Sequence, residues 1–127
     1  SKVRIEIIKK DKSKNIVKDK KIGNILIREQ ILKDFPPKEL RKVIDEGKKD
    51  IKSGIVISIS IFEDKVGLAV GVSKDLTSKY DAVVLAKAAS VILGGKGGGG
   101  RKDFAQAGGV DKSKIEEAFK EISKKIR

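Results

Sequence analysis

Glycines and cations gather in residues 94–109, and phosphate binding is the chemistry that this combination can perform. The segment reads GGKGGGGRKDFAQAGG and holds eight of the chain's 13 glycines. Glycine removes side-chain bulk, so backbone N–H groups can approach phosphate oxygens that neighbouring cations also attract. We therefore predict a nucleic-acid-binding site in this segment. Its expected contact residues are Lys96, Gly97, Gly98, Gly99, Gly100, Arg101, Lys102 and Gln106.

A flexible tether is the alternative interpretation of so many glycines. Tethers are rich in serine, whereas here an ordered run, Arg-Lys-Asp-Phe-Ala-Gln-Ala, separates two glycine clusters. We therefore predict a shaped loop. As an alternative or an addition to phosphate contact, Arg101 and Asp103 would hold this loop together, whereas Phe104 and Ala105 are expected to pack into the core.

Two familiar phosphate-binding motifs do not account for the segment. Gly95, Gly97 and Gly100 satisfy G-x-G-x-x-G, but the residues before them predict a helix, whereas a dinucleotide-binding loop must follow a strand. A Walker A loop needs Ser or Thr after its Gly-Lys pair, and no hydroxyl residue follows here. Mononucleotide hydrolysis is therefore not expected.

Residues suited to catalysis are scarce in this chain. Histidine and cysteine are absent, which removes the common general base, the thiol nucleophile and the usual ligands of structural zinc. The carboxylates Asp64, Asp75 and Asp103 are interpreted as turn or cap residues rather than magnesium ligands. We expect no catalytic site, metal site or cofactor in the chain itself.

Residues 94–109 also resemble a known motif, the glycine-rich signature near the C-terminus of alanyl-tRNA synthetases. That signature typically reads Gly-Gly-Gly-Arg-Pro-Asp-Met-Ala-Gln-Ala-Gly-Gly, and here Lys102 replaces the proline and Phe104 the methionine. DHH phosphoesterases, which share the fold, usually have His at the position of Arg101 and a shorter Ala-Ala-Gly ending. Weaker similarity at 40–45 and 66–76 extends the resemblance to about residues 22–127.

The resemblance implies a C-Ala domain, the C-terminal tRNA-binding module of an alanine-tRNA ligase. Such a module would contact the outer corner, or elbow, of tRNA and support aminoacylation and editing by other domains of the same polypeptide. ATP, magnesium and zinc would be bound elsewhere in that parent enzyme. Two alternatives remain open: a substrate- or single-strand-binding accessory domain of a DHH phosphoesterase, and a structural domain for docking or self-association.

The charge balance independently favours an anionic partner. Thirty Lys and Arg residues face 18 Asp and Glu residues, for a formal net charge of +12. Aromatic residues make up only 4% of the chain, which argues against base stacking and favours recognition of RNA shape and backbone. No apolar run is long enough to span a membrane. We therefore expect a cytoplasmic domain with no membrane partner.

The pattern of apolar residues predicts one α/β (α+β) domain over residues 1–127, with a mixed sheet of about four strands and helices packed on it. Lys48, Lys49 and Lys52 on one predicted helix are further RNA-contact candidates, although a solvated helix face is the favoured explanation of each. Asp81 is expected to cap the second helix, and Asp111 or Ser113 the third. The predicted elements are strand 2–10, a charged connection 9–21, strand 22–32, helix 37–52, hairpin strands 55–62 and 66–72, helix 81–93, the glycine loop and helix 112–126.

Overall fold

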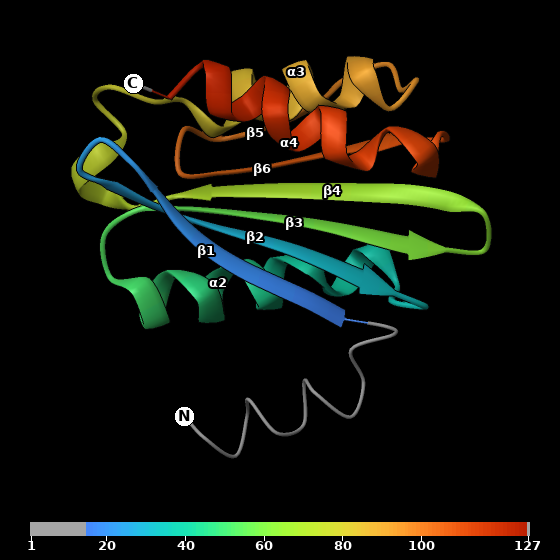
Figure 1. Ribbon diagram of the computed structural model, residues 1–127, viewed down its shortest axis with the longest axis horizontal. Coiled ribbons are helices and arrows are strands. Elements are labelled where there is room, and N and C mark those ends of the chain that lie inside the picture. Colours follow the sequence, from blue (N-terminus) through green and yellow to red (C-terminus); the bar gives the residue numbers. More distant parts are fainter. Residues whose placement is uncertain (1–14, 127) are drawn as a thin grey trace.

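A six-stranded mixed sheet with helices on both faces organises the chain (Figure 1). The computed structural model describes residues 15–126. Its strands lie in the order β1-β2-β3-β4-β6-β5. The elements are β1 (Asn15–Ile22), β2 (Ile25–Lys33), η1 (Pro37–Glu39), α2 (Leu40–Ile51), β3 (Ile55–Phe62), β4 (Lys65–Val72), η2 (Lys74–Leu76), α3 (Ala82–Ile92), β5 (Gly98–Gly100), β6 (Phe104–Gly109), η3 (Lys112–Lys114) and α4 (Ile115–Lys124).

Strand pairing confirms the predicted α+β class. β2 and β3 pair in parallel, and α2 makes the crossover that a parallel pair requires. The pairs β1–β2, β3–β4, β4–β6 and β5–β6 are antiparallel. The described sheet has six strands rather than about four, because β1 and the hairpin β5–β6 arise from segments predicted to be connections.

The hydrophobic core lies on both faces of the sheet. Successive strand residues point to opposite faces, so Ile55, Ile57 and Ile59 of β3 pack with α3 and α4, whereas Val56 packs under α2. Each of these isoleucines is fully buried, and burial of one such side chain contributes about 1.5–3 kcal/mol. Figure 1 shows the resulting three layers, with α2 on one side and α3 and α4 on the other.

Local signals in the sequence predicted the helices well. The helix expected after the two prolines forms as η1 and α2, and it ends at Ile51, shortly before Gly54. Asp81 accepts a hydrogen bond from the Val83 N–H at 2.9 Å, which confirms it as the cap of α3. Asp111, rather than Ser113, caps the short helix η3 that leads into α4.

The prediction that 9–21 is a solvated connection is wrong for its second half, because residues 15–22 form strand β1. β1 is an edge strand of the described sheet, where lysines are well tolerated, and two of its charges, Asp19 and Lys20, pair with residues of β2. Lys20 lies 2.9 Å from the carboxylate of Glu29. Gly23, with φ of 61°, forms the turn between the two strands instead of starting the second. The strand expected at 2–10 lies outside the described residues.

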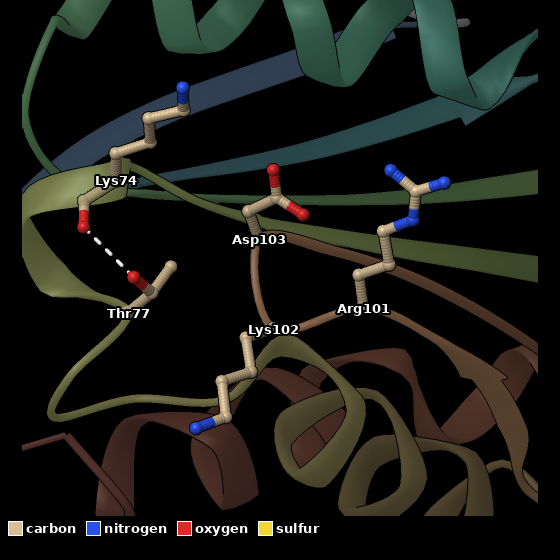
Figure 2. Close-up of a pocket in the computed structure, with 5 residues that line it drawn as sticks. All are labelled: Lys74, Thr77, Arg101, Lys102 and Asp103. Carbon is tan, nitrogen blue, oxygen red and sulfur yellow. Dashed lines mark hydrogen bonds between the residues drawn. The ribbon is translucent and has the colours of Figure 1, made fainter.

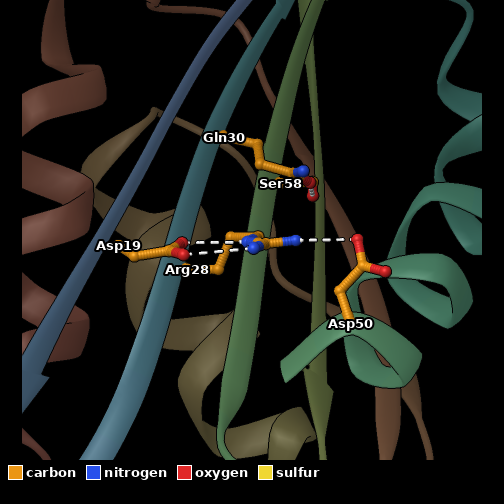
Figure 3. A network of polar contacts seen from close by, with 5 residues as sticks. All are labelled: Asp19, Arg28, Gln30, Asp50 and Ser58. Atoms are coloured by element: carbon orange, nitrogen blue, oxygen red, sulfur yellow. Dashed lines mark hydrogen bonds and ion pairs between the residues drawn. The ribbon is translucent and has the colours of Figure 1, made fainter. Parts of the chain in front are cut away.

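A polar network ties β1, β2 and α2 together (Figure 3). The Arg28 guanidinium donates to both carboxylate oxygens of Asp19 and to Asp50 on α2. The hydrogen bond to Asp19 raises the pKa of Arg28, and burial opposes this only in part. Ser58 donates to Gln30 beside this group, beneath α2. These contacts fix α2, which in turn supports the candidate site described next.

Candidate nucleic-acid interface

The glycine-rich segment folds as a hairpin at one edge of the sheet. β5 pairs antiparallel with β6, and Gly99 lies opposite Gln106. β6 joins β4 along its other side, so the hairpin extends the sheet. The segment is therefore shaped, as predicted, and is not a tether. It consists of paired strands rather than a loop.

Close backbone packing explains why several of these residues are glycine. A Cβ atom at Gly98 would overlap the carbonyl oxygen of Gln106, whereas a Cβ at Gly99 would have no heavy atom within 4 Å. Gly98 therefore serves the packing of the hairpin. At Gly99 the backbone faces open solvent and carries no side chain, so a ligand could approach the backbone closely there.

The C-terminal end of α3 joins the helix to the hairpin. Gly94 adopts φ of 79°, and the N–H groups of Gly94 and Gly95 donate to the carbonyls of Val91 and Ser90, which is a Schellman ending. The buried Ser90 hydroxyl then donates to the Gly108 carbonyl at 2.5 Å and accepts from the Gly97 N–H at 3.1 Å. Ser90 thus attaches both strands of the hairpin to α3 at the open end of the hairpin. Its position in a predicted helix did not indicate this role.

The turn of the hairpin, residues 101–103, is held by its backbone. The Lys102 carbonyl accepts from the Ala82 N–H at 2.9 Å, and the Asp103 carbonyl accepts from the Val72 N–H at 2.9 Å. The ammonium of Lys48 also donates to the Asp103 carbonyl, at 3.1 Å. These bonds fix the turn to α3, β4 and α2 and leave the side chains of Arg101 and Lys102 exposed to solvent.

An open pocket of about 460 Å³ lies against this turn (Figure 2). Three of its lining side chains are cations, and one is a carboxylate. In the view of Figure 2 the Asp103 carboxylate lies between the side chains of Lys74 and Arg101, and Lys102 points the other way. The pocket is therefore positively charged overall. It is lined by Lys74, Thr77, Arg101, Lys102 and Asp103.

The sheet face beside α2 adds a second part to this surface. Side chains alternate along β6, so Ala105 is buried under α3 and α4, whereas Phe104 and Gln106 lie on the α2 side. Phe104 packs against the α2 core cluster, and the Arg41 guanidinium lies 4.9 Å from the centre of its ring. The expected packing of Phe104 and Ala105 is confirmed. Gln106 is exposed next to them.

The structure brings together most of the residues selected from the sequence. Gly98, Gly99, Gly100, Arg101, Lys102 and Gln106 form one continuous surface on the hairpin and its turn. Lys96 and Gly97 lie at the opposite end of β5, near Lys87 of α3, whose Cγ would be 3.6 Å from a Cβ on Gly97. Lys49 and Lys52 are exposed at the end of α2. The sequence did not indicate Lys74, Thr77, Arg41 or Lys87.

A clasp of hydroxyl groups and one carboxylate positions the segment that carries Lys74. Ser53 and Ser73 each donate a 2.5 Å hydrogen bond to Asp75, and the Ser73 hydroxyl accepts from the Gly54 N–H at 3.0 Å. The hydrogen bond from Ser53, followed by that from Ser73, lowers the pKa of Asp75. The clasp thus fixes η2 to the start of β3. Asp75 lies in the first turn of η2, but its carboxylate binds these two hydroxyls rather than capping the helix, so the predicted cap role is not what the structure shows.

This clasp is expected to make folding stability depend on acidic pH. The folded state lowers the pKa of Asp75, so the ionised carboxylate stabilises the fold at pH values above the pKa that Asp75 has in the unfolded chain. This stabilisation is lost as pH falls below about 4. Urea unfolding of the wild type and of Asp75→Asn between pH 7 and pH 2.5 measures this. The stability difference between the two proteins should shrink towards zero at low pH. A difference that stays constant over that range would contradict the assignment.

Neither a metal cluster nor a membrane span is found in the part of the chain that the structure describes. No group of three or more Asp or Glu side chains within residues 15–126 is arranged to hold a metal ion. Over the same range, no helix is long and apolar enough to cross a membrane.

Comparison with known sequences defines the class of domain. The DHHA1 domain family matches residues 23–127, and the chain belongs to this family. Curated relatives named alanine–tRNA ligase share 49% identity over 98 residues in Parvibaculum lavamentivorans and 43% over 106 residues in Bradyrhizobium diazoefficiens. These matches cover 76% and 83% of this chain but only 11% and 12% of the relatives. The chain thus spans about a tenth of the length of the relatives that it matches.

Solved structures show which member of the class the chain resembles. The C-Ala domain from Aquifex aeolicus alanyl-tRNA synthetase superposes with a TM-score of 0.80 and 31% identity, over 86% of this chain and 97% of that domain. The resemblance inferred from residues 94–109 is therefore confirmed. A DHH domain protein of the S1P family of ribosomal proteins superposes with a TM-score of 0.56 at 16% identity, and shares the fold.

Proposed function

We propose that this chain is the C-terminal tRNA-binding module of an alanine–tRNA ligase and that it contacts the elbow of tRNA. In this role it supports aminoacylation and editing, which other domains of the same polypeptide perform. ATP, magnesium and zinc are bound by those other domains. The observation that carries the proposal is the hairpin β5–β6, which presents cations on a fixed backbone in a fold shared with the C-Ala domain.

The electrostatics of the hairpin turn suit a phosphate backbone. Arg101 and Lys102 are exposed, and within residues 15–126 neither side chain forms an ion pair or hydrogen bond. Their charges are available to phosphates, and association releases counterions from the RNA. Since three elements already hold the turn, little backbone entropy is lost when RNA binds. The surface lacks a row of exposed aromatic residues, so shape and backbone contacts carry recognition.

Fluorescence anisotropy at one fixed salt concentration tests this proposal. Intact alanine tRNA is expected to bind more tightly than an acceptor-stem hairpin that lacks the elbow. Lys102→Ala is expected to weaken tRNA binding about fivefold, which corresponds to ~1 kcal/mol for one exposed phosphate contact. Lys120→Ala, which removes an exposed lysine from α4, an element that does not line the pocket, is the matched control and should leave affinity unchanged.

Other outcomes point to other functions. Equal binding of the two RNAs, or equal loss in both variants, contradicts elbow recognition. Preference for a single-stranded oligonucleotide would favour the accessory role found in DHH phosphoesterases. If Arg101→Ala changes the sedimentation coefficient of the chain and not its RNA affinity, the surface serves self-association.

A further inference from the structure

We propose that the pocket against the hairpin turn binds one ribose with its two flanking phosphates, and that Asp103 recognises the 2′-hydroxyl. This inference rests on the proposed function, because it assigns a chemical role to a pocket on the same RNA-binding surface. It adds Lys74, Thr77 and Asp103 to the contact residues, and it makes the pocket selective for RNA over DNA.

The charge arrangement of the pocket is the first observation. Lys74, Arg101 and Lys102 line the pocket together with a single carboxylate, yet none of these cations lies within ion-pair distance of Asp103. Within the described range the Asp103 carboxylate accepts no hydrogen bond, although the carbonyl of the same residue accepts two. A carboxylate left unpaired beside three cations is a free acceptor that the surrounding protein does not use.

A purely anionic ligand does not match this pocket. A phosphate placed against Asp103 would be repelled, because like charges at contact distance are unfavourable. In Figure 2 the carboxylate lies between Lys74 and Arg101, so the side chains follow the spatial order cation, acceptor, cation. An RNA backbone offers the complementary sequence of phosphate, hydroxyl donor and phosphate. The 2′-hydroxyl is the group that distinguishes it from DNA.

Thr77 supplies a second acceptor. Its hydroxyl donates to the Lys74 carbonyl at 2.9 Å, so its proton is already committed within the protein. A hydroxyl group retains acceptor lone pairs when its proton is donated. The Asp103 carboxylate and the Thr77 oxygen can therefore both accept a hydrogen bond from a ligand, and a ribose hydroxyl is such a donor.

The lining chemistry favours sugar and phosphate over a base. Base recognition by proteins normally combines edge hydrogen bonds with stacking on an aromatic or Arg plane. The pocket is lined by Lys, Thr, Arg and Asp, and the nearest large aromatic residue of the hairpin, Phe104, is packed into the α2 cluster under Arg41. The pocket thus has no aromatic surface on which a base would stack, and the one guanidinium of its lining, that of Arg101, is assigned to a phosphate.

Both walls of the pocket are held in place before a ligand arrives. The Lys102 and Asp103 carbonyls are bonded to α3 and β4, and the Asp75 clasp fixes the short helix that bears Lys74. Preorganisation of this kind makes a single hydroxyl contact measurable, because binding does not first have to order the site.

A double-mutant cycle tests the pairing of Asp103 with a 2′-hydroxyl. Binding of the wild type and of Asp103→Ala is measured by anisotropy with two RNAs of identical sequence that carry the tRNA elbow, one all-ribose and one with 2′-fluoro sugars. The 2′-fluoro sugar keeps the A-form pucker but cannot donate a hydrogen bond. The wild type is expected to prefer the ribose RNA about tenfold, as for one hydrogen bond to a charged group. Asp103→Ala should reduce that preference to about twofold or less.

Glu116→Ala provides the matched control, since it removes an exposed carboxylate from α4, away from the pocket. This variant should keep the full preference, and thermal unfolding of all three proteins checks that each is folded. Equal preferences in the wild type and Asp103→Ala, or no preference in the wild type, would overturn the assignment of the 2′-hydroxyl while RNA binding itself stands. Failure of the wild type to bind the ribose RNA would overturn both this inference and the proposed function.

Discussion

Replacing Gly95 with alanine is expected to lower the free energy of unfolding by about 3 kcal/mol. A Cβ at this position would overlap the carbonyl oxygen of Gly108 and lie 2.5 Å from Ser90 Oγ. Backbone and a buried hydroxyl cannot move aside as the end of a flexible side chain can, so the hairpin would have to separate from α3. Urea unfolding followed by circular dichroism measures the loss.

Gly99→Ala is the matched control because it makes the same substitution in the same glycine-rich segment. No heavy atom lies within 4 Å of a Cβ at Gly99, so its effect on the free energy of unfolding should stay within about 0.5 kcal/mol. A similar cost for the two variants would mean that the glycines act through chain flexibility rather than through close packing of the hairpin against α3 and β6.

Elements with strong local signals could be predicted from the sequence. The helix after Pro37 and the helix after Asp81 begin where proline and a cap residue predict a start, and both carry an apolar face. The hairpin of β3 and β4 follows from two β-branched apolar runs separated by a short polar turn. For these elements, the contacts that decide the structure lie close together in the chain.

The strands β1 and β5, which the sequence did not predict, depend on contacts with residues elsewhere in the fold. β1 has too many charges to be read as a strand, and Lys20 becomes acceptable there because Glu29 and Ser123 both lie 2.9 Å from its ammonium group. β5 consists of glycines, which have low strand propensity, and it forms because β6 offers a paired edge. Propensity alone predicts coil in both places, and tertiary pairing overrides it.

The residues of the candidate site also fall into two groups, those close to the glycines in sequence and those that only the fold brings there. Arg101 and Lys102 could be selected because they adjoin the glycines in sequence. Lys74 and Thr77 come from a separate short helix, and the fold places them against the turn through the end of β4 and the Asp75 clasp. Lys48 was selected as a possible RNA contact, and the structure adds a role that its sequence position did not indicate, because its ammonium group donates to the Asp103 carbonyl and supports the turn. No local pattern distinguishes a lysine that supports a loop from one that binds a ligand.

Affinity for tRNA is expected to fall roughly 100- to 500-fold when monovalent salt is raised from 50 to 200 mM. This range follows if five cations of the surface each contact one phosphate, because each neutralised phosphate contributes about 0.7 to 0.9 to the slope of log affinity against log salt concentration. Anisotropy titrations at four or more salt concentrations give that slope. The five cations are Arg41, Lys74, Lys96, Arg101 and Lys102.

The double variant Arg101→Ala/Lys102→Ala should reduce the magnitude of this slope by about 1.4 to 1.8, because two of the phosphate contacts are lost. Lys120→Ala/Lys125→Ala removes the same charge from exposed positions on α4 and its C-terminal end, and should leave the slope unchanged. If both double variants lower the slope equally, the net charge of +12 attracts RNA without a defined interface. A loss confined to the first variant localises phosphate contact to the hairpin turn, where the backbone is already fixed for binding.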